Sequence, residues 1–165
     1  MATALRNLSE YDKDFVPNGA DFRIGIVVSE WNDNITLNLL KGAKEALLDN
    51  GVKEENIIVR FVPGAFELPL GAQYFLEYAK VDGVVAIGTV IQGETKHFDF
   101  VCDGATQGIK DVSLNYNKPV AFCLLTDNNM QQSIDRSGGK HGNKGIECAI
   151  ACLKMIGLQQ SFIQQ

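Results

Sequence analysis

The sequence predicts an α/β fold, a three-layer α/β/α sandwich built around a four-stranded parallel sheet. The alternation of two sequence patterns predicts this fold. Short apolar runs alternate along the 165-residue chain with segments whose apolar residues recur every three or four positions. Helices between successive strands imply right-handed crossovers and a parallel sheet covered on both faces. A hydrophobic fraction of 45% and a charged fraction of 21% fit one domain over 1–165, with a polar leader over 1–20.

The first strand and helix are predicted at the start of this domain. Residues 22–29 form an apolar run of the kind that is buried on both faces of a parallel sheet. Residues 35–47 then carry apolar side chains at helical spacing. Asn50 and Gly51 follow, a pair suited to a left-handed helix end. The first unit is therefore a strand followed by a helix.

Two further units follow the same order. A β-branched run over 56–62 predicts the second strand, which Pro63 ends. A helix is expected after Glu67, and the pattern that indicates it consists of Leu70, Phe75, Leu76 and Ala79. The third strand is predicted over 83–91 and its helix over about 98–115.

The last third of the chain completes the pattern. The fourth strand is predicted over 119–125, and a short helix over 128–136 follows it. The polar, glycine-rich stretch 137–145 predicts a break with the character of a flexible loop. A final helix is expected over 146–156.

Charge and composition exclude several classes of partner. The net charge of −5, without a basic cluster, argues against nucleic acid. No apolar run reaches the ~18 residues that span a bilayer, and the first residues lack the apolar region of a secretory signal, so we expect no membrane partner and a cytoplasmic location. The four cysteines contain no Cys-x-x-Cys pair and are expected to be reduced thiols, mostly in the core.

Ligands of such sheets bind beyond the carboxyl ends of the strands, which directs attention to the turns there. Trp31, the only tryptophan, follows the first strand. It is either a core aromatic or a flat ring that stacks on a planar heterocycle. The bend after the second strand, 62–68, contains small residues that would let a ligand reach backbone amides.

The turn after the third strand carries the most chemical information. Residues 93–95 are expected to present free amides near a helix start, where a phosphate is favoured. His97 stands at the same helix start, where the helix dipole favours a neutral imidazole able to exchange protons. The alternative is a surface or capping histidine. Only two histidines occur and no zinc spacing is present, so no metal site is predicted.

Arg136 and Lys144 are the candidate anion-binding residues among the cations beyond the fourth strand. Arg136 is suited to bidentate anion binding and Lys144 offers a point charge, although either could be a solvated surface residue. No phosphate-loop string and no Gly-x-Gly-x-x-Gly after a strand occurs. The sequence therefore predicts neither a nucleotide nor a nicotinamide cofactor.

Four separated strings resemble the lumazine synthase family, in its order and with similar spacing. The resemblance covers residues 22–158. The strings are Trp31-Asn32, Val62-Pro63-Gly64-Ala65-Phe66-Glu67-Leu68-Pro69, Gly88-Thr89-Val90-Ile91-Gln92-Gly93-Glu94-Thr95-Lys96-His97-Phe98-Asp99 and residues 136–145. The resemblance implies a flavodoxin-like sandwich, with an extra N-terminal strand that could be exchanged with a neighbouring subunit.

The resemblance also implies the activity and the residues that carry it. Members condense 5-amino-6-(D-ribitylamino)uracil with 3,4-dihydroxy-2-butanone 4-phosphate, a transferase reaction of riboflavin biosynthesis that uses no cofactor or metal. The residues expected to hold the pyrimidinedione are Trp31, Ala65, Phe66, Glu67, Thr89, Val90, Ile91, Phe122 and Lys144. Those expected at the phosphate are Glu94, Thr95 and Arg136. The catalytic set is His97, Arg136 and Lys144.

The family's assembly is part of the same expectation. Phe122, Arg136 and Lys144 would come from a neighbouring subunit of a homopentamer. The short form of the stretch 137–145 favours closure of pentamers into a sixty-subunit icosahedral capsid, with riboflavin synthase as a potential partner. Two alternatives stay open: an archaeal-type riboflavin synthase that disproportionates two lumazines, and a shell protein whose pocket has decayed.

Overall fold

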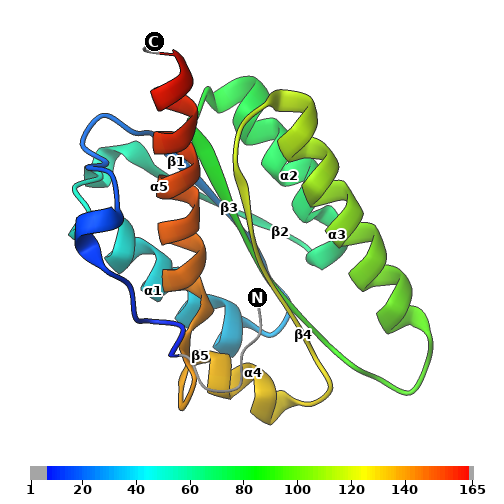
Figure 1. Ribbon diagram of the computed structural model, residues 1–165. Helices are drawn as coiled ribbons and strands as arrows, with labels where there is room; N and C mark the ends of the chain where they lie inside the picture. Colours follow the sequence, from blue (N-terminus) through cyan, green and yellow to red (C-terminus); the bar gives the residue numbers. More distant parts are fainter. Residues whose placement is uncertain (1–6, 164–165) are drawn as a thin grey trace.

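A computed structural model describes residues 7–163 of the chain (Figure 1). Its centre is a four-stranded parallel sheet in the order β2-β1-β3-β4. The strands are β1 (Ile24–Ser29), β2 (Ile57–Val62), β3 (Gly83–Ile91) and β4 (Val120–Asp127). Each lies within two residues of its prediction, and the predicted α/β/α sandwich with four parallel strands is confirmed.

Helices cover both faces of this sheet (Figure 1). Helices α1 (Asp33–Asp49) and α5 (Lys144–Ile163) pack on one face, and α2 (Leu68–Tyr74) and α3 (His97–Tyr116) on the other. The sheet separates two apolar cores, because alternate side chains of β1 and β3 point to opposite faces. Every residue of β1 is buried, as its unbroken apolar run predicted.

The end of α1 follows the predicted helix-stop chemistry. Asn50 caps the helix, with its backbone N–H donating to the Leu47 carbonyl at 3.2 Å, and the Gly51 N–H donates to the Leu48 carbonyl at 3.0 Å. Gly51 comes next with a φ of +91°, in the left-handed region where a side chain would be strained. The chain can therefore turn sharply toward β2.

The second helix departs from its prediction in two respects. After α2 the chain widens into a π-helical turn, Phe75–Ala79, which ends at Lys80 with a φ of +54°. Of the residues in the predicted helix pattern, Phe75 and Leu76 are buried, but Leu70 is 49% exposed. The helix begins at Leu68, and this phase turns Leu68 rather than Leu70 into the core.

The stretch 137–145 is more ordered than its composition suggests. Helix α4 (Met130–Arg136) leads into a small antiparallel ribbon of β5 (Ser137–Gly139) and β6 (Gly142–Asn143). The Asn143 side chain donates to the carbonyl of Asn38 in α1 at 2.8 Å and accepts from the amide of Gly145 at 2.8 Å. The predicted flexible loop is therefore a fixed hairpin.

The N-terminal segment forms no strand between residues 7 and 23; it contains only the 3-10 turn η1 (Lys13–Phe15). Within residues 7–163 no strand pairs with the outer edge of β2. The extra N-terminal strand therefore remains a prediction, because residues 1–6 lie outside the described part of the chain.

Helix α5 is long and apolar enough, by length and composition alone, to cross a membrane. It instead contributes the buried side chains of Cys148, Ala149, Cys152, Leu153 and Ile156 to the core shared with α1. Core helices commonly meet the same criterion, so it is weak evidence for a span.

Candidate active site at the carboxyl ends of the strands

A cavity of about 680 Å³ lies where β1, β2 and β3 end. It is lined by Trp31, Asn32, Gly64, Ala65, Phe66, Glu67, Thr89, Val90, Ile91, His97, Phe100 and Val101. The turns after β1 and β2 and the end of β3 thus converge with the first turns of α3. All of the predicted pyrimidine-binding residues except Phe122 and Lys144 are in this set, together with His97.

Trp31 lies at the mouth of this cavity. The residue after it, Asn32, takes left-handed backbone angles, with a φ of +57°, and caps α1. The Trp31 ring is 72% exposed. Of the two alternatives left by the sequence, the core aromatic is excluded, and a ring available for stacking remains.

The second wall is the 3-10 turn Ala65–Glu67 (η3) after β2. Ala65 is buried, whereas the Phe66 ring is 59% exposed. The back of that ring contacts α3 at Gly104, where a Cβ atom would lie only 2.5 Å from Phe66 Cε2. Gly104 therefore leaves the space that Phe66 occupies beside the cavity.

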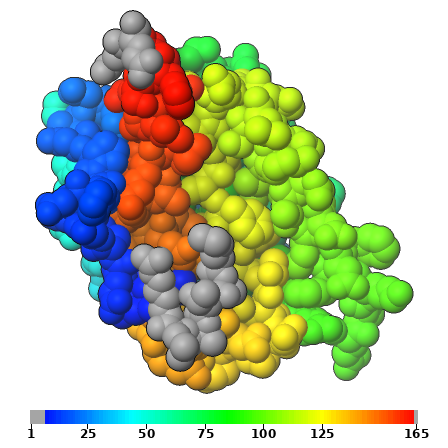
Figure 2. All heavy atoms as spheres, viewed as in Figure 1, coloured from blue at the N-terminus to red at the C-terminus, as the bar shows by residue number. Residues whose placement is uncertain are grey.

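His97 is the first residue of α3 and is exposed. Its backbone N–H donates to Thr95 Oγ1 at 3.4 Å, which ties the helix start to the preceding turn. Glu94 and Thr95 lie in that exposed turn and are not among the residues that line the cavity. Figure 2 shows this stretch, in green, projecting from the body of the molecule.

Four cavity residues were not predicted as site residues: Asn32, Gly64, Phe100 and Val101. Phe100 is 71% exposed. Positions three and four after His97 share its face of a helix, so Phe100 and Val101 could have been found from the helix start alone. Asn32 and Gly64 carry no such signal beyond their adjacency to Trp31 and Ala65.

Phe122, Arg136 and Lys144 do not line this cavity in the described chain. Phe122 lies on β4 and is 36% exposed. Its carbonyl accepts from Cys148 Sγ of α5 at 3.3 Å, which places it beside the start of that helix. Within one chain these three residues are therefore separate from the residues that line the cavity.

Lys144 begins α5 and has a mostly buried side chain, 16% exposed. Its Nζ donates to Glu147 Oε2 at 3.0 Å. Burial favours the neutral amine, but the charges of Cys148 and Glu147 and the Glu147 hydrogen bond together raise the pKa of Lys144 above its ordinary value. The amine is therefore an ammonium ion at neutral pH.

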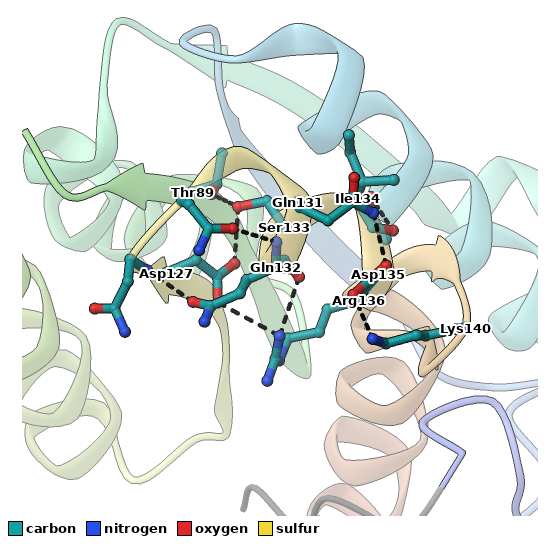
Figure 3. A network of polar contacts seen from close by, with 12 residues as sticks. Thr89, Asp127, Gln131, Gln132, Ser133, Ile134, Asp135, Arg136 and Lys140 are labelled. Atoms are coloured by element: carbon teal, nitrogen blue, oxygen red, sulfur yellow. Dashed lines mark hydrogen bonds and ion pairs between the residues drawn. The ribbon is translucent and has the colours of Figure 1, made fainter.

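Arg136 belongs to a polar network that reaches the cavity (Figure 3). Its Nη1 lies 3.9 Å from Asp127 Oδ1 and donates to the Gln132 carbonyl at 3.1 Å. Asp127 accepts from Ser133 Oγ at 2.8 Å, and Ser133 Oγ lies 3.3 Å from Thr89 Oγ1. The network joins the ends of β3 and β4 to α4.

The cysteines are all free thiols, as predicted. Three are buried and Cys102 is partly buried. Burial, with the nearby charge of Cys148, raises the pKa of Cys152 to about 12. Among residues 7–163, no group of three or more His, Cys, Asp or Glu side chains is arranged to hold a metal ion.

Comparison with known proteins agrees with this geometry. The model of the 6,7-dimethyl-8-ribityllumazine synthase family matches residues 21–160. A protein of that name from Flavobacterium johnsoniae is 63% identical over 160 residues, which cover 97% of this chain and 84% of the relative. Two further proteins of that name come from Christiangramia forsetii and Porphyromonas gingivalis and are 58% and 53% identical to this chain. Each match covers 97% of this chain, and covers 96% of the first protein and 99% of the second. With the match spanning the whole sandwich and every wall of the cavity, this chain belongs to the 6,7-dimethyl-8-ribityllumazine synthase family.

Proposed function

We propose that this chain is a transferase of riboflavin biosynthesis, a 6,7-dimethyl-8-ribityllumazine synthase. It would condense 5-amino-6-(D-ribitylamino)uracil with 3,4-dihydroxy-2-butanone 4-phosphate, giving the lumazine, inorganic phosphate and two molecules of water. One observation carries the proposal: exposed aromatic rings, backbone groups at strand ends and a single histidine line the same cavity.

The pyrimidinedione is a flat heterocycle with hydrogen-bonding edges, and the cavity offers matching chemistry. The exposed rings of Trp31 and Phe66 supply faces for stacking. The backbone of η3 and of the last residues of β3, Thr89–Ile91, supplies N–H and C=O groups that pair with the edges of the ring. A volume of about 680 Å³ falls within the range of small-molecule sites.

His97 is the proposed proton-transfer residue. The amine of the pyrimidine attacks the ketone and loses water to form a Schiff base, phosphate leaves, and ring closure expels a second water. Protons move at each of these steps, and an imidazole at the cavity can accept and return them. Holding the two reactants together could supply ~7 to 11 kcal/mol of the barrier.

The phosphate end is assigned to a second group of residues. Glu94 and Thr95 precede α3, whose N-terminus favours an anion. Arg136 of a neighbouring subunit would pair with the phosphate, while the neighbour's Phe122 and Lys144 would complete the pyrimidine pocket. The proposal is supported by the separation of these three residues from the cavity within one chain.

A shared site requires an oligomer, and we propose a homopentamer that closes into a sixty-subunit capsid in the cytoplasm, able to enclose riboflavin synthase. Five chains of 18.1 kDa weigh about 90 kDa, and sixty weigh about 1.1 MDa. Light scattering separates these masses. A particle near 90 kDa would remove the capsid, and a monomer with full activity would remove the shared site.

The activity test uses the purified protein with both substrates. We expect a product with the absorbance of the lumazine and release of one phosphate per product. Omitting either substrate is the control. No product from the pair, or riboflavin formed from lumazine alone, would contradict the proposal.

A further inference from the structure

Asp127 is a buried acid at the end of β4, where contacts of both its backbone and its side chain hold it in position. The residue is 6% exposed and pairs in register with Ile91, the last residue of β3. Its backbone carbonyl accepts from the amide of Gln92 at 2.9 Å. Its two carboxylate oxygens contact different partners, Ser133 and Arg136, both on α4 (Figure 3).

The hydrogen-bond directions in this network follow from the donors available. An ionised carboxylate only accepts, so the single proton of Ser133 Oγ is donated to Asp127 Oδ2, 2.8 Å away. In the 3.3 Å contact with Thr89 the Ser133 oxygen then accepts, and Thr89 Oγ1 donates. Ser133 is fully buried and Thr89 is 3% exposed, so solvent does not compete for these bonds.

The other carboxylate oxygen faces the guanidinium of Arg136. That residue ends α4, and its polar side-chain contacts within residues 7–163 engage Nη1 alone, with Asp127 Oδ1 and the Gln132 carbonyl. The side chain is 33% exposed. The guanidinium is therefore held from the protein side and remains accessible to an anion from the other side.

We propose that Asp127, oriented by Ser133, is a positioning residue that fixes the Arg136 guanidinium for the phosphate group of the substrate. The proposal rests on the proposed function and deepens it, because it assigns how the anion-binding arginine is held. Within one chain the same network reaches Thr89, which lines that chain's own cavity, while its Arg136 would serve the site of the neighbouring subunit.

The charge of Asp127 has a second effect. A carboxylate beside the guanidinium lowers the attraction of the site for a phosphate dianion. Product phosphate is then released more readily, while the geometry that guides its departure is kept. Removing the charge should therefore strengthen phosphate binding and weaken turnover, a combination that general loss of structure would not produce.

The test compares four variants by calorimetric titration with inorganic phosphate and by steady-state kinetics. In Asp127→Asn we expect phosphate to bind roughly 3- to 10-fold tighter, as for the loss of one partly exposed charge pair, and kcat to fall. Asp127→Glu keeps the negative charge, so its phosphate affinity should equal that of the parent protein. Ser133→Ala keeps the charge, so kcat should fall with phosphate affinity unchanged.

Asp135→Asn is the matched control. This carboxylate neighbours Arg136 in sequence but pairs with Lys140 at 3.2 Å and with Gln131 at 2.9 Å instead. It should leave both phosphate affinity and kcat at parental values. Thermal unfolding of each variant reports whether the fold is retained.

Unchanged or weaker phosphate binding in Asp127→Asn would overturn the inference, as would an equal response in Asp135→Asn. Phosphate titration needs no turnover, so the inference is tested even if the parent protein forms no lumazine. A parent protein that forms no lumazine would instead count against the proposed function.

Discussion

Replacing Gly104 by alanine is a defined perturbation of the cavity wall. A Cβ atom at this position would lie 2.5 Å from Cε2 and 3.2 Å from Cδ2 of Phe66. Carbon atoms attract best at about 3.5–4.0 Å, so the ring edge must retreat by about 1 Å. Because Phe66 is 59% exposed, the ring has room to move, and it moves within the wall of the cavity.

The magnitudes follow from two opposing effects on stability and one on binding. Alanine in place of glycine stabilises a helix by up to about 1 kcal/mol, and an off-rotamer Phe66 costs about 0.5–1.5 kcal/mol. The net change lies between a gain of about 0.5 and a loss of about 1.5 kcal/mol, so the melting temperature should fall by no more than about 6 °C. A lost aromatic contact of about 0.5–1.5 kcal/mol raises KM for the pyrimidine roughly 2- to 10-fold.

Steady-state rates at saturating ketose phosphate, with the pyrimidine varied, measure this effect. Gly108→Ala is the control on the same helix: its Cβ would lie 2.7 Å from Pro69 Cγ, outside the cavity lining. That variant should lose stability and keep the parental KM. An unchanged pyrimidine KM in Gly104→Ala, or a rise in KM for the ketose phosphate alone, would refute the placement of Phe66 against the heterocycle.

Three further predictions concern proton transfer, thiols and pH. His97→Ala should slow turnover roughly a hundredfold or less with the KM for both substrates nearly kept; an unaltered kcat would remove His97 from the mechanism. In the native protein only Cys102 should react with a thiol reagent, and it should react slowly because burial and two nearby aspartates raise its pKa. After denaturation all four thiols should react. Fast labelling of a second thiol in the native protein would contradict the packing. The hydrogen bond to Glu77 raises the pKa of Tyr116. The stabilisation of the fold by this bond is therefore complete below pH 10 and is lost as pH rises through the folded-state pKa. Ultraviolet titration should show a late tyrosinate step that is absent from Tyr116→Phe.

The sheet and its covering helices could be predicted because their signals are periodic and long. Strand β3 was predicted at its observed bounds, since seven buried residues and two partly buried ones follow one another between clear turn signals. The π-helical turn at Phe75–Ala79 could not, because one inserted residue changes hydrogen bonding without changing which residues are apolar.

The candidate site was predicted for a different reason and with different gaps. Residues of the cavity wall were found from family strings at strand ends, but it is exposure that excludes a core position for Trp31, and only the fold provides exposure. The hairpin β5–β6 was missed because strands of two and three residues are too short to alternate visibly. Its order comes instead from Asn143 and from Ser9, 134 residues earlier in the chain.

The division of the interior into two apolar cores has a consequence for changing this protein by design. The buried side chains on opposite sides of the sheet belong to separate clusters, and sites more than about 7–10 Å apart usually contribute independently to stability. The layer formed by α1 and α5 can therefore be varied to gain thermal tolerance, while the layer beneath the cavity is varied to alter ligand preference. The best variants from two such separate searches could be combined with little correction for epistasis.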